Sequence, residues 1–319
     1  MANFLSKSFL TQSFCIPAPI LTEKNLPDQH GRVHLITGGY AGVGKELATI
    51  LFEKGATVYI AGRNETKARE AMVQIQKNRS SRGRLEFLFL DLNDLETISS
   101  AVDSFKFRES RLDVLVNNAG VMFPPQGTKT KQGHDIQFGT NVLGPFLLTK
   151  LLIPTLVQTA RSSPRNSIRV LWAASSGIQV LSPNGGIVWG DNGGPKVFES
   201  QQTNYGQTKV ANVLLAIKIQ ELYRHEGIVS VSFNPGNLQT ELQRHSTGIL
   251  MKLSENMLYP AIYGAYTELY SGWSENISTD QDITYIMPWG RDGTNLLRSD
   301  IQKAIQAGLA GRIWDCAKP

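Results

Sequence analysis

Cysteines, long apolar runs and dense clusters of charge are all scarce in this 319-residue sequence. The only two cysteines, Cys15 and Cys316, lie near opposite ends of the chain and form neither a disulfide framework nor a C-x-x-C metal motif. No run of 18 apolar residues occurs, and polar residues interrupt the apolar character of residues 1–15. The sequence therefore predicts a reduced, cytoplasmic protein with no membrane span, no signal peptide and no metal site.

The charge balance argues against a role in nucleic-acid binding. The chain has 32 Lys and Arg against 27 Asp and Glu, a net charge of +5, and these basic residues form no dense run. A hydrophobic fraction of 41% with 18% charged residues is typical of a soluble globular domain. A mildly basic balance also suits a site for an anionic nucleotide.

Apolar segments alternate with helical patterns along most of the chain. Strands spaced by helices in this way predict an α/β fold, a single Rossmann-type doubly wound parallel sheet flanked by helices on both faces. Strands are expected at 32–36, 56–61, 85–90, 112–116, 168–174, 228–233 and 284–287. Helices are expected at 47–54, 64–78, 94–107, 133–156 (stopped around Pro154), 204–225, 260–272 and 300–308.

The chain is expected to form one domain. Three prolines before residue 28 predict an irregular N-terminal extension over residues 1–31, and no linker divides residues 32–319. The Gly-, Pro- and Asn-rich segment 177–203 and the segment 239–287 are the expected walls of a substrate pocket, because long loops at the active edge often shape one. Their large apolar side chains suggest an apolar or polycyclic ligand and are equally consistent with ordinary packing; they are Trp189, Phe198, Leu250, Met251 and Tyr259.

A glycine-rich turn, Thr37-Gly38-Gly39-Tyr40-Ala41-Gly42-Val43-Gly44, joins the first strand to the first long helix. Glycines in this context permit a tight turn and let the backbone approach a pyrophosphate at the helix N-terminus. The turn predicts a dinucleotide site at Gly38, Gly42, Val43 and Gly44, the alternative being a glycine turn that binds nothing.

The ends of the next strands indicate which dinucleotide is bound. An NAD site usually has Asp or Glu at the end of the second strand, whereas this chain has Ala61-Gly62-Arg63-Asn64. Arg63 is placed to face a 2′-phosphate, which favours NADP, unless its side chain points to solvent. Asp91 could accept a hydrogen bond from the adenine amine or cap the next helix. Asn118 and Gly120 would line the cofactor at the same edge of the sheet.

Tyr205 and Lys209 lie four residues apart, on one face of an expected helix. A cation beside a phenol stabilises the phenolate, and lowering a phenol pKa by about three units takes roughly 4 kcal/mol. Such pairs are common on solvated helices, so the surroundings decide the meaning of this one. Ser175 ends the fifth strand, where a hydroxyl can hydrogen-bond a substrate oxygen. Asn141 is either functional or a buried amide with satisfied hydrogen bonds.

After the sixth strand, the backbone at Leu238 and the hydroxyl of Thr240 are expected to hold the nicotinamide amide or a phosphate. The motifs T-G-x-x-x-G-x-G, N-N-A-G, N-V-L-G, S-S, Y-x-x-x-K and P-G-x-x-x-T occur in this order. Over roughly residues 30–245 the chain therefore resembles the short-chain dehydrogenase/reductases. Residues 21–28, 61–64 and 263–270 more narrowly resemble fungal members, which are similar to retinol dehydrogenases and the WW-domain-containing oxidoreductase. Many of those belong to secondary-metabolite pathways.

The resemblance implies NADP(H)-dependent interconversion of a carbonyl and an alcohol on a small molecule. Tyr205 would exchange a proton with the carbonyl oxygen, and Ser175 would hydrogen-bond that oxygen. Lys209 would lower the pKa of Tyr205 and hold the nicotinamide ribose, while Asn141 would orient a water toward Lys209. The family also implies a homodimer or homotetramer formed through the helices that carry Asn141 and Tyr205. Two alternatives remain: a catalytically idle NADP-binding scaffold or sensor, and an epimerase or dehydratase with the same Tyr–Lys pair.

Overall fold

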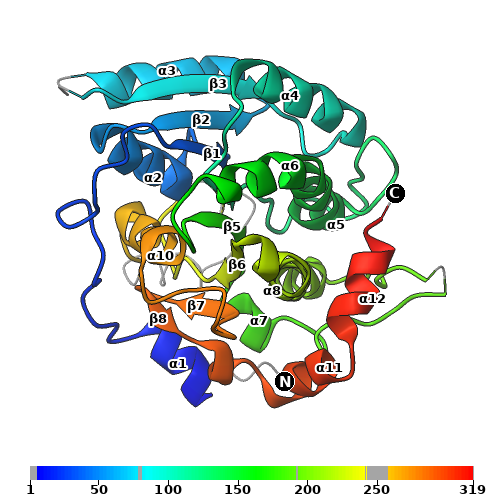
Figure 1. Ribbon diagram of the computed structural model, residues 1–319. Coiled ribbons are helices and arrows are strands. Elements are labelled where there is room, and N and C mark those ends of the chain that lie inside the picture. Colours follow the sequence, from blue (N-terminus) through cyan, green and yellow to red (C-terminus); the bar gives the residue numbers. More distant parts are fainter. Residues whose placement is uncertain (1–5, 78–80, 192, 241, 243–257, 319) are drawn as a thin grey trace.

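A twisted sheet runs through the centre of the protein (Figure 1). The computed structural model describes residues 6–77, 81–191, 193–240, 242 and 258–318. The strand order is β3-β2-β1-β4-β5-β6-β7-β8, and every neighbouring pair is parallel except β7 and β8. The strands are β1 (Val33–Thr37), β2 (Thr57–Gly62), β3 (Arg84–Phe89), β4 (Val114–Asn117), β5 (Ile168–Ala173), β6 (Ile228–Phe233), β7 (Tyr285–Met287) and β8 (Arg291–Asp292).

Helices cover both faces of this sheet, which confirms the predicted fold class. One apolar core lies between the sheet and α2, α3 and α10, and a second lies between the sheet and α4, α6 and α8. All residues of β1, β4, β5 and β6 are buried, as continuous apolar strands require. The helices are α2 (Gly42–Glu53), α3 (Glu65–Gln76), α4 (Leu95–Arg108), α6 (Gly144–Arg161), α8 (Gln201–Tyr223) and α10 (Ala261–Trp273).

The long helix expected to stop around Pro154 continues through it. Asp135 caps its first turn, and α5 (Ile136–Phe138), a π-helical turn (Gly139–Leu143) and α6 follow without a break. Pro154 lies on the exposed side of α6, where the carbonyl that loses its partner can be hydrated, while the opposite side is buried. This stretch is long and apolar enough to cross a membrane by composition, but 72% of its most apolar window is buried inside the fold.

The N-terminal extension contains a helix, so the expectation of an irregular segment over residues 1–31 needs correction. Helix α1 (Lys7–Ser13) precedes all three prolines, and the hydroxyl of its N-cap Ser6 accepts the N–H of Phe9 at 3.2 Å. Prolines limit where a helix can extend, but they do not prevent one that ends before them. A further short helix, α7 (Gly177–Val180), follows β5 inside the segment expected to be irregular.

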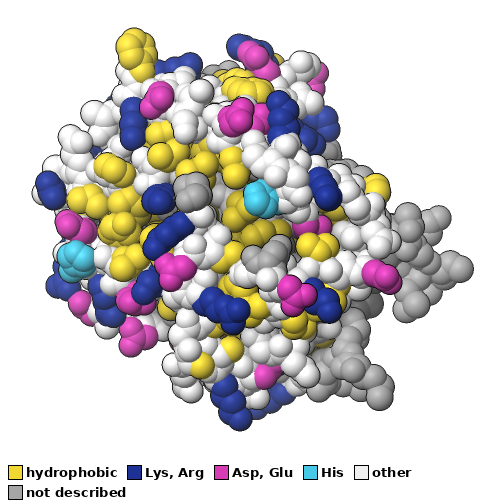
Figure 2. All heavy atoms as spheres, turned by 90° about the vertical axis from the view of Figure 1, so that its right-hand side faces the viewer, with side chains coloured by type: hydrophobic (Ala, Val, Ile, Leu, Met, Phe, Trp, Pro, Cys, Tyr) yellow, Lys and Arg dark blue, Asp and Glu magenta, His cyan; other side chains and the backbone are white. Residues whose placement is uncertain are grey.

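The C-terminal part adds two helices, α11 (Ser299–Gln306) and α12 (Leu309–Cys316), of which only α11 was expected. Helix α12 packs against α8, and the ring of Trp314 meets Phe146 of α6 edge-on, with 5.1 Å between ring centroids. Figure 2 shows this side of the molecule, where Lys and Arg side chains are interspersed with Asp and Glu and with apolar side chains. The helices expected to form an oligomer interface are thus partly covered by the chain itself.

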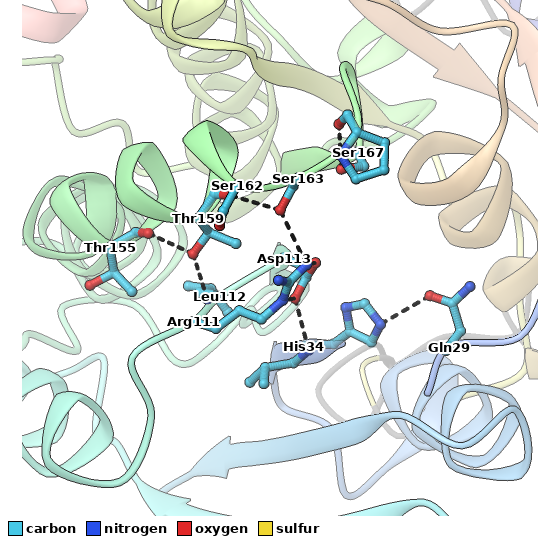
Figure 3. Close-up of polar contacts among 12 residues, drawn as sticks. Gln29, His34, Arg111, Leu112, Asp113, Thr155, Thr159, Ser162, Ser163 and Ser167 are labelled. Atoms are coloured by element: carbon cyan, nitrogen blue, oxygen red, sulfur yellow. Dashed lines mark hydrogen bonds and ion pairs between the residues drawn. The ribbon is translucent and has the colours of Figure 1, made fainter. Parts of the chain in front are cut away.

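A polar network holds the strand beginnings together at the amino edge of the sheet (Figure 3). Asp113, just before β4, accepts the N–H of Val33 at 2.9 Å and pairs with Arg111 at 2.6 and 2.7 Å. The hydroxyl of Thr159 in α6 accepts the N–H of Leu112 at 3.0 Å. These contacts lock β1, β4 and α6 together at one edge and leave the opposite edge for a ligand.

His34, in β1, is fully buried at this amino edge. Its Nε2 lies 3.2 Å from Oε1 of Gln29, and its ring meets Trp273 edge-on at 5.1 Å. Burial lowers the pKa of His34 from 6.5 to about 3, although the nearby Asp113 carboxylate opposes this shift. The folded protein therefore holds His34 in its neutral form.

We expect His34 to make the protein less stable as the pH falls from 6.5 toward 3. Within this window the unfolded chain protonates His34 and the folded chain does not, so unfolding takes up a proton and stability falls by at most about 1.4 kcal/mol per pH unit. Between pH 7.5 and pH 5, the free energy of unfolding measured by chemical denaturation should fall by about 2 kcal/mol less in His34→Gln than in wild type. His225→Gln, at an exposed histidine, is the control and should behave like wild type. An equal loss in wild type and His34→Gln would contradict the prediction.

Candidate functional site

A cavity of about 790 Å³ lies along the carboxyl ends of the strands and gathers most of the predicted site residues. The point where the strand order reverses, between β1 and β4, lies within this edge, as expected for a ligand site in an open α/β sheet. Gly44 and Asn141 are not part of the lining. The predicted residues that line it are Gly38, Gly42, Val43, Arg63, Asp91, Asn118, Gly120, Ser175, Tyr205, Lys209, Leu238 and Thr240.

The glycine turn has the conformation that its sequence predicts. Gly38 and Gly42 have φ of +68° and +51°, in the left-handed region that favours glycine. Thr240 lies over the turn, since a Cβ added at Gly42 would be 3.4 Å from its Cβ and Cγ2. A Cβ added at Gly44 would be 2.7 Å from Nδ2 of Asn118 and 2.8 Å from the carbonyl oxygen of Gly38. Gly44 therefore allows α2 to approach the strand ends closely, and its role is packing.

Thr37 joins the ends of β1 and β4. Its hydroxyl accepts the N–H groups of Asn118 at 3.0 Å and Ala119 at 2.9 Å, and it donates to the carbonyl of Val116 at 3.3 Å. In return, Nδ2 of Asn118 donates to the carbonyl of Thr37 at 2.9 Å. Thr37 is the first residue of the glycine motif, but its role in joining the strand ends was not predicted from the sequence.

Two cations lie at the β2 end of the cavity. The side chain of Arg63 is exposed, and Lys67, in the first turn of α3, lines the same wall. Asn64 caps α3 by accepting the N–H of Lys67 at 2.9 Å, which fixes this turn against the end of β2. Lys67 was missed in the sequence, where its spacing of four residues from Arg63 was the available signal. A phosphate group at this end could meet both side chains.

Asp91 lies in the cavity wall after β3 and is not the helix cap that the sequence also allowed. Its Oδ1 accepts the N–H of Asn93 at 3.0 Å within a turn. Asp94 caps α4 instead, with its Oδ1 accepting the N–H of Glu96 at 3.2 Å. Asp91 is left in a position to meet a ligand at the same end as Arg63.

Lys209 is buried beside Tyr205 in α8. The two residues are 4% and 5% exposed, and the Lys209 Nζ lies 5.4 Å from the centroid of the Tyr205 ring. The carbonyl oxygen of Ala173 accepts hydrogen bonds from this Nζ at 2.9 Å and from Nδ2 of Asn212 at 2.8 Å. Burial lowers the pKa of Lys209 from 10.5 to about 8, so it is a cation at neutral pH.

The expected lowering of the Tyr205 pKa by Lys209 is absent from the protein alone. Burial raises the pKa of Tyr205 from 10.0 to about 12, against the smaller lowering effect of its hydrogen bond with Ser175. Burial therefore dominates the pKa of Tyr205, and its phenol keeps its proton across the neutral range.

Ser175 and not Ser176 faces the cavity. The Ser175 hydroxyl accepts the N–H of Gly177 at 3.0 Å and lines the cavity beside Tyr205. Ser176 is buried and donates to Oδ1 of Asn237 at 3.3 Å. This geometry favours Ser175 as the hydroxyl that meets a substrate.

Asn141 is a buried amide whose hydrogen bonds are satisfied, as one of the two predicted readings allowed. In the π-helical turn before α6, its Nδ2 donates to the carbonyl of Val121 at 2.9 Å and to Oγ1 of Thr208 at 3.1 Å. Its Oδ1 accepts the N–H of Val121 at 2.8 Å. A Cβ added at Gly120 would lie 3.1 Å from this Oδ1 and 3.7 Å from the Nζ of Lys209. Asn141 therefore lies next to Lys209 and positions its surroundings without lining the cavity.

The apolar wall of the cavity differs from the one expected. None of the described residues of segment 177–203 lines the cavity, and Trp189 instead packs under Arg312 with 3.9 Å between the guanidinium carbon and the ring centroid. Phe198 and Tyr259 are also outside the lining, and Leu250 and Met251 lie outside the described residues. The apolar side chains found there include Phe9, Phe14, Val121, Met122, Leu242 and Leu258.

This arrangement suits a phosphorylated dinucleotide and a carbonyl or alcohol. The glycine turn offers backbone amides at the N-terminus of α2, the β2 end offers cations, and a phenol with a hydroxyl lies near the end of β5. Among the described residues, no group of three His, Cys, Asp or Glu side chains is placed to hold a metal ion. The chemistry available from the chain is proton transfer and hydrogen bonding.

Comparisons with known proteins agree with this chemistry. The family model for short chain dehydrogenases matches residues 32–165. A short-chain dehydrogenase/reductase of Phomopsis amygdali is 43% identical over 311 residues, covering 93% of this chain and 91% of that protein.

Solved structures show the same fold at lower identity. RhlG of Pseudomonas aeruginosa, in complex with NADP, has a TM-score of 0.61 at 22% identity and covers 85% of this chain and 98% of that chain. A 3-ketoacyl-(acyl-carrier-protein) reductase of Brucella melitensis, complexed with NADH, has a TM-score of 0.61 at 23% identity, with coverage of 82% and 99%. With 43% identity to the Phomopsis amygdali protein over nearly its whole length, the chain belongs to the short-chain dehydrogenase/reductase family.

Proposed function

We propose that this protein is an NADP(H)-dependent oxidoreductase that interconverts a carbonyl and an alcohol on an apolar secondary metabolite. The main support is that Tyr205, Ser175 and Lys209 line the same cavity as the glycine turn and Arg63. The family uses nicotinamide cofactors, and the choice of NADP rests on the two cations and the missing acid at the β2 end. Because proteins of similar fold are found in complex with NADP and with NADH, we infer the cofactor from the residues of this chain.

The residues of this chain supply the acid–base chemistry. When bound, the nicotinamide supplies or accepts the hydride. The buried phenol of Tyr205 is protonated at neutral pH, so it can donate its proton to a carbonyl oxygen as that oxygen gains negative charge. The Ser175 hydroxyl lies beside the phenol and can donate a hydrogen bond to the same oxygen. Because Tyr205 is protonated near neutral pH, it is ready to act as the acid in carbonyl reduction.

Lys209 links the proton site to the cofactor site. Its pKa of about 8 means that it carries a proton at neutral pH yet can release it more readily than an exposed lysine. Its ammonium lies beside the ring of Tyr205, so it can return a proton to the phenol after the phenol has donated one. Lys209 also lines the cavity and can hydrogen-bond the nicotinamide ribose. Asn141 acts here as a positioning residue.

Two alternatives use the same cavity. A catalytically idle NADP-binding scaffold or sensor would not require a lysine buried at a desolvation cost beside a phenol. An epimerase or dehydratase would use the Tyr–Lys pair but leave no net change in the cofactor. Steady consumption of NADPH with a ketone separates the proposed activity from both.

Replacing Tyr205 with phenylalanine removes the proton donor and leaves the ring that fills the space. We expect Tyr205→Phe to lower kcat for NADPH-dependent ketone reduction by about 100-fold or more, because a positioned acid contributes on this scale. The NADPH Kd, measured by cofactor fluorescence, should change less than about twofold. Tyr223→Phe, in the same helix but outside the cavity, is the matched control. Wild-type turnover by Tyr205→Phe would refute the assignment.

The cofactor preference is tested at Arg63. A lost charge-assisted contact to a phosphate should raise the KM for NADPH by about 10- to 100-fold in Arg63→Ala and leave the KM for NADH nearly unchanged. Arg69→Ala is the control, because Arg69 lies in the following helix α3, pairs with Glu65 and does not line the cavity; it should leave both values unchanged. Steady-state kinetics with both cofactors measure this, and an equal loss with NADPH and NADH would contradict the role of Arg63.

The two free cysteines and the packing of α12 bear on the protein's location and assembly. Free Cys15 and Cys316 support a reducing compartment such as the cytoplasm. Because α12 packs against α8, we propose that a homodimer or homotetramer, if one forms, uses other faces.

Light scattering should give the same native mass, 35.2 kDa or a multiple of it, for wild type and for Ile217→Cys, at a half-buried position of α8. Under mild oxidation, a disulfide-linked dimer of Ile217→Cys that wild type does not form would show that two α8 helices face each other and would contradict the proposal.

A further inference from the structure

We propose that helix α1 forms a fixed wall of the substrate pocket, with Phe9 and Phe14 selecting for large apolar substrates. Both side chains line the same cavity as Tyr205 and Ser175. This inference rests on the proposed carbonyl–alcohol activity and adds to it the element that recognises the substrate.

Gln12 anchors α1 to the residue that follows β6 and to the first residue of β7. It is fully buried, and its Oε1 accepts the hydroxyl of Tyr285 at 2.7 Å and Nδ2 of Asn234 at 3.1 Å. Its Nε2 donates to the carbonyl of Ser8 at 3.1 Å within the helix. A buried amide with this many partners fixes both the position and the rotation of the helix, because each lost hydrogen bond would leave a buried polar group.

Two further hydrogen bonds hold the same helix. The hydroxyl of Ser8 donates to the carbonyl of Leu296 at 2.5 Å. Nη2 of Arg291 donates to the carbonyl of Thr11 at 2.9 Å. With Gln12, these contacts tie both turns of α1 to the C-terminal part of the chain, so α1 is held as a wall rather than hinged as a lid.

The place of α1 in the fold puts it at the catalytic end of the cavity. Figure 1 shows α1 beside α7 and β8, and α1 contacts α7, which directly follows Ser175. Its anchors Asn234 and Tyr285 lie at β6 and β7, whereas Arg63 lies at β2, beyond β5, β4 and β1 in the strand order. The cofactor phosphates and α1 therefore occupy opposite ends of the cavity.

The aromatic side chains at α1 line the cavity and do not pack in either apolar core. No residue of α1 belongs to either apolar core of the described chain. Phe14 is 40% exposed, and Phe9 is half-buried, yet both line the cavity. A helix that is held by polar contacts and places Phe9 and its C-cap residue Phe14 in the cavity of a reactive phenol is suited to bind an apolar substrate. Leu10 is 38% exposed on the same helix but does not line the cavity, so it supplies a matched control.

Binding of the apolar dye 1-anilinonaphthalene-8-sulfonate to the NADPH-saturated protein tests the wall without turnover. We expect Phe9→Ala and Phe14→Ala each to weaken dye binding several-fold, and Leu10→Ala to leave it unchanged. Thermal unfolding should be the same in all three, because these side chains lie outside the cores. Wild-type dye affinity in both phenylalanine variants, or no dye binding to wild type, would overturn the proposal.

Turnover then tests selection. With trans-1-decalone, a bicyclic apolar ketone, the KM should rise about 10-fold in Phe9→Ala and Phe14→Ala while kcat changes less than about twofold. With 2,3-butanedione, a small ketone, neither constant should change. Equal effects on both ketones, or none, would contradict selection by α1 while leaving the proposed activity intact. If wild type consumes no NADPH with any ketone, the proposed activity fails, and the dye measurement still decides whether α1 forms an apolar wall.

Discussion

The hydroxyl of Thr37 joins two strand ends, and the ligand edge of the sheet depends on this join. Because β1 and β4 flank the reversal in strand order, its hydrogen bonds to Val116, Asn118 and Ala119 fix the glycine turn against the segment that lines the opposite wall. Asn118 then lies so close to α2 that position 44 has no room for a side chain. One hydroxyl thus sets the spacing between the N-terminus of α2 and the segment that follows β4 at Asn118 and Ala119.

Burial decides the chemistry of the Tyr–Lys pair more than the charge between its members. In water the phenol and the ammonium lose their protons at nearly the same pH. In this protein burial moves the pKa of Tyr205 up to about 12 and that of Lys209 down to about 8, so the lysine gives up its proton first. The phenol therefore holds its proton more tightly than the ammonium does, an order that burial imposes and that the two side chains do not have in water.

The fold and the cavity residues that follow the strand ends could be predicted from sequence because both follow from periodicity. Buried strands are continuous apolar runs, and the residues just after them lie on one edge of the sheet. Short helices such as α1 and α12 could not be predicted, since partners far along the chain stabilise them, as Tyr285 does for Gln12. Likewise, Pro154 remains helical because the rest of α6 is buried. The preference for NADP and the roles of the site residues remain predictions.

The hydrogen bond between Gln12 and Tyr285 spans 273 residues, which links the pocket to the order in which the chain is made. During synthesis α1 leaves the ribosome about 15 to 50 seconds before its anchor, at typical rates of elongation. Until β6 and β7 have joined the sheet, the amide of Gln12 lacks both of its partners there, and α1, at seven residues, is too short to persist alone. A segment that is translated before every strand of the sheet is therefore among the last to take its place in the fold.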